Sequence, residues 1–265
     1  MFVLGLRFSD LSNTEYLSSL TTYKYLFKNS ILIFGVDYEL PGVFSNVPFE
    51  SAVNGSLWTL PHELRLYILL CIILSLSIKL QVKFQFFSTK ILVLLLALFA
   101  CFIHLTDTSS LIIHSEFSRL FYLFFAGASF YMWRDTIKLS SIYFIIVCLL
   151  LLVSLMNKTL FFYSYYVCLP FLVLYIAYIP KGFILKFNNW GDYSYGMYIY
   201  AFPIQQSLIA LDDSLTVIEM IIYSFGITFV LAYISWHLIE KKFLELKPFH
   251  TTLTKYVKNI FKYDN

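Results

Sequence analysis

Hydrophobic residues in this chain are gathered into about seven long stretches that are separated by short polar segments. Each stretch is long enough to cross a hydrocarbon core of about 30 Å as an α-helix. Because lipid offers the backbone no hydrogen-bonding partner, we expect helices in all of them and no open strands. The pattern predicts an all-α integral membrane protein, a polytopic helical bundle with about seven transmembrane helices. The predicted helices are residues 58–78, 89–105, 117–133, 139–156, 160–179, 193–211 and 215–238.

The residues on either side of these stretches differ in character. The part from Thr21 to Phe34 has an amphipathic pattern that is typical of an interfacial helix. Pro41, Gly42 and Pro48 predict that the segment leading to the first stretch is a loop. We therefore divide the chain into three parts. They are a non-cytoplasmic segment with a candidate interfacial helix (1–56), a transmembrane domain (57–240) and a basic cytoplasmic tail (241–265).

Composition agrees with a membrane location. The chain is 59% hydrophobic and only 13% charged, whereas soluble domains carry about 25% charged residues. The formal net charge of +3 gives no indication of a nucleic-acid partner. Each of the four cysteines lies in a different apolar stretch, and none has the spacing of a metal site or a disulfide framework. These cysteines are Cys71, Cys101, Cys148 and Cys168. We expect no metal.

Charge alternates from loop to loop. Lysine and arginine gather in every second loop, whereas the loops between them carry acidic residues; only Lys158 opposes the pattern. By the positive-inside rule the basic loops are cytoplasmic. The N-terminal segment is then outside and the C-terminus is in the cytoplasm, as in a multi-pass protein of the plasma membrane. The basic loops hold Lys79, Lys83, Lys90, Arg134, Lys138, Lys181 and Lys186, and the acidic ones Asp107, Glu116, Asp212 and Asp213.

A carboxylate lies just inside the first apolar stretch. Glu63 follows the sequence Asn-Gly-Ser-Leu-Trp that ends at Trp58. A charge within the hydrocarbon costs about 2.5–3.5 kcal/mol, which indicates a function. The alternative is structural: if the helix begins near Leu60, Glu63 lies in its first turn, where the helix dipole favours negative charge. From the residues alone, the functional and the structural interpretation are equally supported.

Two further segments combine small, aromatic and polar residues. Phe124, Gly127 and Tyr131 fall on one helical stripe, and physical chemistry alone favours a helix-packing surface there. Later, Pro203 lies within a predicted helix. Gln205 and Gln206 follow it inside the apolar stretch, where their amides need hydrogen-bonding partners.

These segments resemble motifs of the acyltransferase-3 family of membrane enzymes. Gly55, Ser56, Leu57, Trp58 and Glu63 match its Gly-Ser-Leu-Trp-x-x-x-x-Glu signature. The stripe matches Phe-x-x-Gly-x-x-x-Tyr. The later segment, from Ser194 to Pro203, is similar to Ser-Tyr-Gly-x-Tyr-x-Tyr-His-x-Pro, with Ala201 in place of the histidine. The resemblance runs from about Phe2 to Leu246.

The resemblance implies transfer of an acyl group, usually acetyl, to a hydroxyl of a cell-surface polysaccharide or lipid-linked glycan. The donor would be acetyl-CoA or another acyl-CoA, and the other partner would be membrane lipid. Carried over by motif, Glu63 and Tyr131 would be catalytic, and substrate would contact Ser56, Trp58, Phe124 and Gly127. The family's first helix, with its arginine and proposed catalytic histidine, has no counterpart here. We therefore expect the chain as written to resemble the carboxyl-terminal three-quarters of such an enzyme and to transfer nothing by itself.

Two other classes remain open. In a transporter or channel, polar residues within the apolar stretches would line the pathway. They are Glu63, Arg65, Gln205 and Gln206. Against this class, the sequence shows no inverted repeat and no paired broken helices. The third class is a catalytically inactive membrane fragment with a structural role.

Overall fold

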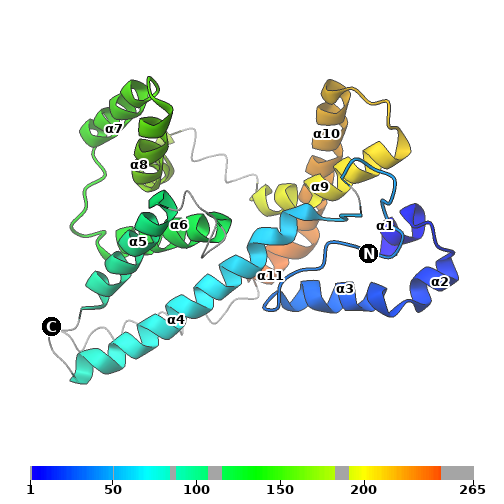
Figure 1. The fold of residues 1–265 in the computed structure, drawn as a ribbon, viewed down its shortest axis with the longest axis horizontal. Coiled ribbons are helices and arrows are strands. Elements are labelled where there is room, and N and C mark those ends of the chain that lie inside the picture. The colour runs from blue at the N-terminus through cyan, green and yellow to red at the C-terminus, as the bar shows by residue number, and fades with distance from the viewer. Residues whose placement is uncertain (1, 50, 84–87, 107–114, 183–190, 246–265) are drawn as a thin grey trace. The chain divides into compact units, whose positions relative to one another are not determined.

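The computed structural model describes residues 2–49, 51–83, 88–106, 115–182 and 191–245. Within these ranges the protein is helical, and its only β-structure is two isolated bridges, Ser9–Val43 and Glu39–Ala52. The prediction of an all-α fold is confirmed (Figure 1). The elements are α1 (Phe2–Phe8), α2 (Asn13–Ser18), α3 (Leu20–Ile31), the 3₁₀ turn η1 (Gly55–Trp58), α4 (Thr59–Lys83), α5 (Thr89–Thr106), α6 (Ser115–Met132), α7 (Ser141–Ser154), α8 (Lys158–Tyr178), α9 (Ser194–Leu211), α10 (Val217–Ser235), the π-helix η3 (Trp236–Glu240) and α11 (Lys241–Glu245).

Each of the seven predicted stretches corresponds to one helix, α4 to α10, with bounds that differ by a few residues. Four helical segments in the described residues are long and apolar enough to cross a membrane: Gly55–Ser77, Thr89–Thr106, Lys158–Tyr178 and Val217–Glu245. The predicted count of seven is not supported. The apolar helix α7 has 14 residues, fewer than the roughly 20 that a span needs. Helices α6 and α9 are made less hydrophobic by serines, tyrosines and charged or amide side chains.

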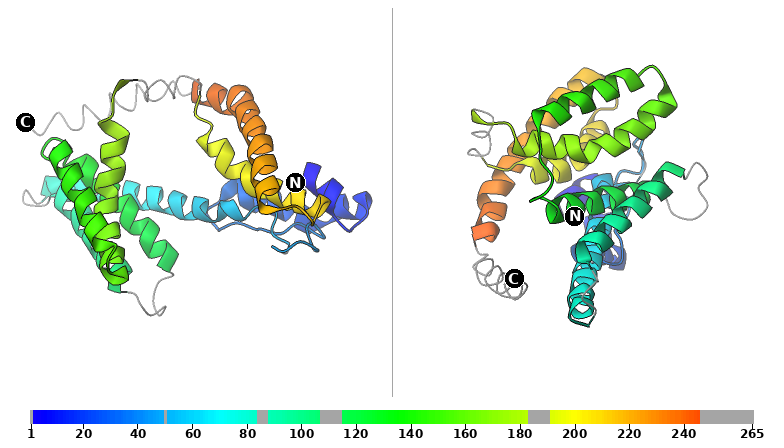
Figure 2. Two further views of the ribbon diagram at one scale, coloured as in Figure 1. Left: turned by 90° about the horizontal axis from the view of Figure 1, so that it is seen from above. Right: turned by 90° about the vertical axis from the view of Figure 1, so that its left-hand side faces the viewer.

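The chain forms two compact units. The first comprises residues 1–58 and 187–265, and the second comprises residues 59–186. In the first unit α9 and α10 form an antiparallel pair, seen side by side in Figures 1 and 2. A Cβ atom at Gly196 of α9 would lie only 2.8 Å from Cα of Ala232 in α10. Glycine at this position therefore allows the two backbones to touch.

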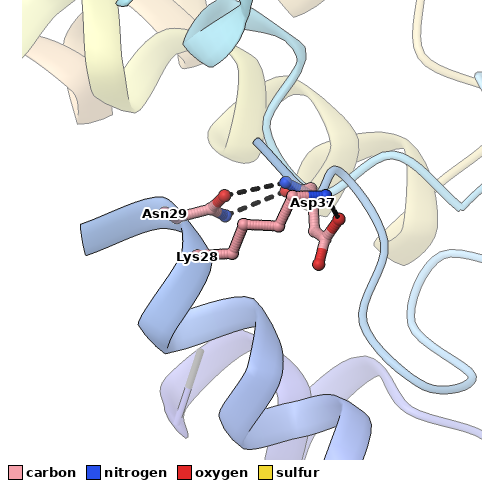
Figure 3. A network of polar contacts seen from close by, with 3 residues as sticks. All are labelled: Lys28, Asn29 and Asp37. Atoms are coloured by element: carbon pink, nitrogen blue, oxygen red, sulfur yellow. Dashed lines mark hydrogen bonds and ion pairs between the residues drawn. The ribbon is translucent and has the colours of Figure 1, made fainter. Parts of the chain in front are cut away.

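The N-terminal segment folds onto this pair as a lobe of three short helices and a long loop. Its core contains Tyr16, Tyr25 and Val43, and Ile209 of α9 packs against them. Polar contacts connect the loop to the end of α3 (Figure 3). The Asn29 amide donates to the Asp37 carbonyl at 2.9 Å and accepts from the Asp37 N–H at 2.8 Å, and the Lys28 ammonium pairs with the Asp37 carboxylate.

The predicted helix in this segment is present as α3. Its outward side carries exposed apolar residues, among them Leu20 and Phe27, which are 83% and 71% exposed. Such a surface suits the boundary between water and lipid. Its position at that boundary stays a prediction.

In the second unit α5 pairs with α6, and α7 pairs with α8 (Figures 1 and 2). Leu66, Val93, Ala97 and Phe125 form a buried core shared by α4, α5 and α6. Helix α8 is joined to α6 by a hydrogen bond from the Tyr122 hydroxyl to the Tyr166 carbonyl, at 2.9 Å.

That hydrogen bond has a simple cause in the sequence. Pro170 lies inside α8 and has no N–H to donate to the carbonyl four residues earlier, which is that of Tyr166. A carbonyl left without a partner inside an apolar segment is costly, since lipid cannot replace the lost donor. The Tyr122 hydroxyl supplies the donor from a different helix.

Candidate functional site

The segment around Ser56 lies against α9, within the first unit. The Asn54 amide donates to the Ile199 carbonyl at 3.0 Å, and the Tyr198 hydroxyl donates to the Ser56 carbonyl. A Cβ atom at Gly55 would lie 2.8 Å from the Phe202 ring. Two of the three motifs found in the sequence, which lie far apart along the chain, are therefore in direct contact.

Pro203 explains one of these contacts. It lies inside α9 and cannot donate to the Ile199 carbonyl, four residues before it. Asn54, which is only 6% exposed, donates to that carbonyl instead. The arrangement repeats the one at Pro170 with a different donor. The same Asn54 side chain also accepts a hydrogen bond from the Ser56 N–H at 3.1 Å, which fixes the turn into η1.

Gln206 holds the loop that precedes the motif. Its side chain is 4% exposed, and its amide donates to the carbonyls of Phe49 at 2.7 Å and Ala52 at 2.8 Å. The prediction that this buried amide needs partners is confirmed. The corresponding prediction for Gln205 is wrong, because its side chain faces outward and is exposed.

The contact residues Asn54, Tyr198, Phe202 and Gln206 were not among the predicted site residues. A signal for three of them exists in the sequence: Tyr198, Phe202 and Gln206 are four residues apart and so lie along one face of α9. Of the predicted substrate-binding residues in this unit, Ser56 takes part through its backbone, and Trp58 is half-buried at the end of η1.

Glu63 lies in the second unit as the fifth residue of α4. The expected start of the helix near Leu60 is confirmed to within one residue, since α4 begins at Thr59, but its first turn contains no acidic residue and Glu63 follows that turn. The favourable effect of the helix dipole falls off within that turn. The structural explanation for this charge is therefore weakened. The carboxylate is exposed, and no hydrogen bond or ion pair involves it among the described residues.

Helices α4 and α6 run in the same direction where they meet. The His62 ring lies beside Phe117, with centroids 5.3 Å apart, and Tyr67 lies beside Phe124 at the same distance. Glu63 is thus near the start of α6. At a rise of about 1.5 Å per residue, Tyr131 lies about 20 Å further along the helix than Phe117. The two predicted catalytic residues belong to opposite ends of the unit and do not form one constellation.

Part of the helical stripe formed by Phe124, Gly127 and Tyr131 faces a cavity. No heavy atom of the described residues lies within 4 Å of a Cβ built on Gly127, so the predicted close helix packing at this residue is wrong. Tyr131, on the same stripe, is 67% exposed. Phe124 alone of the three packs in the core, against Tyr67 and Phe125. Gly127 and Tyr131 instead line a cavity of about 430 Å³ together with Arg134.

This geometry predicts the relative effects of two substitutions. A helix-packing surface at the stripe would make bulk at Gly127 more disruptive than bulk at Ala128. Ala128, however, packs against the buried core of α4, α5 and α6, whereas Gly127 borders open space. We expect Ala128→Leu to lower the melting temperature in detergent, and Gly127→Leu to leave it nearly unchanged, because overpacking costs about 1–3 kcal/mol. Equal destabilisation by both changes would contradict this assignment.

No group of three potential metal ligands occurs among the described residues. His104 lies within α5, where its Nδ1 is 3.1 Å from the Ser118 hydroxyl and its ring packs on Tyr166. His237 donates through Nδ1 to the Tyr233 carbonyl at 2.9 Å in the π-helix that follows α10. The described histidines therefore lie in separate structural positions.

The all-helical fold, with four helical segments long and apolar enough to span a membrane among the described residues, supports a helical membrane protein. The chain is similar to a protein of Shigella phage Sf6 that is described as an O-acetyl transferase, with 29% identity over 202 residues. The match covers 74% of this chain and 58% of the phage protein, so the chain spans less than two-thirds of that relative. No protein-family model and no solved structure matches the chain.

Proposed function

We propose that this protein is a membrane-bound O-acyltransferase of the acyltransferase-3 type, most simply an O-acetyltransferase. It would transfer the acyl group of acetyl-CoA, or another acyl-CoA, to a hydroxyl of a cell-surface polysaccharide or lipid-linked glycan. The similarity to the phage O-acetyl transferase carries this proposal. The contact between the Ser56 segment and α9 supports it, since the two motifs that suggested the function meet in space.

The proposed reaction has few requirements. The acceptor hydroxyl oxygen attacks the thioester carbonyl, the C–S bond breaks, and the coenzyme A thiolate takes up the proton that a base removes from the hydroxyl. Such a step needs a positioned base and hydrogen-bond donors for the carbonyl oxygen as its charge develops. In our proposal Glu63 orients the base or binds the acceptor at the predicted outer end of α4. Tyr131 belongs to the predicted cytoplasmic end, where the donor arrives.

A transporter explains the polar residues less well. In that class the buried amides would face a pathway. Gln206, the more buried of the two glutamines, instead uses its amide to hold the carbonyls of Phe49 and Ala52. The Gln206 amide thus joins two chain segments and does not line a pathway, which favours the acyltransferase over the transporter.

The test is acyl transfer in membranes. Membranes from cells expressing the complete reading frame would be given acetyl-CoA with a labelled acetyl group, and their glycans would be isolated and analysed by NMR for O-acetyl groups. We expect label in ester linkage to a sugar hydroxyl, released by mild alkali. Glycans identical to those of cells with an empty vector, despite normal protein in the membrane, would overturn the proposal.

A further inference from the structure

The cavity beside Gly127 has the form of a ligand site. Its volume of about 430 Å³ lies within the range of about 300–1,000 Å³ that is typical of small-molecule pockets. Its walls come from the last turns of α6, from the loop that follows, and from α8. They include Gly127, Phe130, Tyr131, Arg134, Leu174 and Tyr178. The interior is mostly apolar, and Arg134 is the cation among its lining residues in the described part of the chain.

Arg134 is held in place before any ligand binds. Its guanidinium carbon lies 4.4 Å from the centroid of the Tyr131 ring, and Nη1 donates to the Tyr131 carbonyl at 3.1 Å. A guanidinium stacked on an aromatic ring retains further N–H donors in a planar fork, which suits a phosphate. The cavity therefore offers an exposed guanidinium that can bind a phosphate beside an apolar space.

A second cavity of about 390 Å³ adjoins the first and shares Phe130 and Ile137 with it. Trp133 lines this second cavity. Its indole Nε1 is buried and has no hydrogen-bond acceptor among the described residues. The protein itself covers this N–H, which presents almost no surface to the cavity. The two cavities together offer an elongated, mostly apolar space with the Arg134 guanidinium in its wall.

We propose that this cavity binds the phosphopantetheine arm and acyl group of the acyl-CoA donor, with Arg134 on a phosphate. This inference rests on the proposed function. The arm is a phosphate ester joined to a flexible chain that contains amides and ends in a thioester carbonyl. A membrane phospholipid shares the phosphate and the apolar chain, and the experiment must distinguish the two. The location also agrees with charge: the end of α6 with Arg134 and Lys138 is the predicted cytoplasmic end, where acyl-CoA is found.

Gly127 allows a direct test, because it lines the cavity and an added Cβ atom there meets no described residue outside its own helix within 4 Å. Protein from the complete reading frame, reconstituted in nanodiscs, would be titrated with labelled acetyl-CoA. We expect Gly127→Leu and Arg134→Gln each to weaken binding by about tenfold or more, with Arg134→Lys intermediate. Gly226→Leu is the matched control. It places the same side chain on a helical glycine of α10, in the other unit, where an added Cβ also meets nothing within 4 Å.

A second measurement does not depend on the variants. An acyl-CoA with a diazirine in its acyl chain, photolysed on the wild-type protein, should label peptides from the end of α6 or from α8. Unchanged acetyl-CoA affinity in Gly127→Leu, with labelling elsewhere, would place the donor at another site and leave the proposed function intact. Loss of bound phospholipid from Gly127→Leu in native mass spectrometry, with acetyl-CoA binding unchanged, would make the cavity a lipid site. Absence of acetyl-CoA binding by the wild-type protein would overturn the proposed function itself.

Discussion

Replacing Glu63 by glutamine should abolish acyl transfer while leaving the folded protein in the membrane at its normal level. Glutamine keeps the size of the side chain and removes its charge, so the change tests the carboxylate alone. The carboxylate is exposed, lies beyond the first turn of α4 and makes no hydrogen bond or ion pair within the described part of the chain. Little stability therefore depends on it. If it orients the base or binds the acceptor, we expect a rate loss of about 100-fold or more.

The measurement is the initial rate of acetyl transfer in isolated membranes, divided by the amount of protein. Glu116→Gln is the matched control, since Glu116 is also an acidic residue near the start of α6, where it pairs with Arg119. This variant should keep most of the activity, because a surface ion pair contributes only about 0–1 kcal/mol. Normal transfer by Glu63→Gln would return the residue to a structural role.

The positions of the helices follow from the sequence because a long apolar run in lipid has few alternatives to a helix. Each of α4 to α10 overlaps one predicted stretch over most of its length. The number of spans does not follow as directly. Helix α7 is strongly apolar and yet contains only 14 residues, because Ser154 to Asn157 form a turn instead of continuing the helix. A hydropathy profile alone does not show that the helix ends at this turn.

The function of single small residues is harder to predict. Gly127 and Gly196 both lie in helices with tyrosines nearby, and a small residue in a membrane helix usually indicates close packing. At Gly196 that interpretation is right, since Ala232 lies against it; at Gly127 the helix borders a cavity. The difference depends on where neighbouring helices lie, and the sequence pattern of a single helix does not contain this information.

For the same reason, sequence analysis cannot identify the groups that donate to the two carbonyls that the prolines leave without a partner. A proline inside a helix predicts which carbonyl loses its partner, and here these are Tyr166 and Ile199. It does not predict the replacement. One donor, Tyr122, comes from α6, and the other, Asn54, comes from a loop 145 residues away from its acceptor. Only the fold brings them together.

The effect of these donors can be measured. Asn54→Leu should destabilise the first unit, and Tyr122→Phe the second, each by about 1–3 kcal/mol, the cost of leaving a buried carbonyl unpaired. The measurement is reversible unfolding in mixed micelles. The sharper test combines each change with removal of its proline. In Pro203→Ala or Pro170→Ala the new alanine N–H can donate to Ile199 or Tyr166, as in a regular helix.

We therefore expect Asn54→Leu to cost much less in the Pro203→Ala background, and Tyr122→Phe much less in the Pro170→Ala background. The resulting coupling should be about 0.5–3 kcal/mol, as for residues that share one hydrogen-bond network. Tyr175→Phe is the control, because the Tyr175 hydroxyl lies in the same helix as Pro170 but donates to the Ser141 hydroxyl at 2.8 Å. Its cost should be the same with and without the proline. If the costs of Asn54→Leu and Tyr122→Phe are likewise the same with and without the prolines, these side chains do not stabilise the protein through the carbonyls that the prolines leave unpaired.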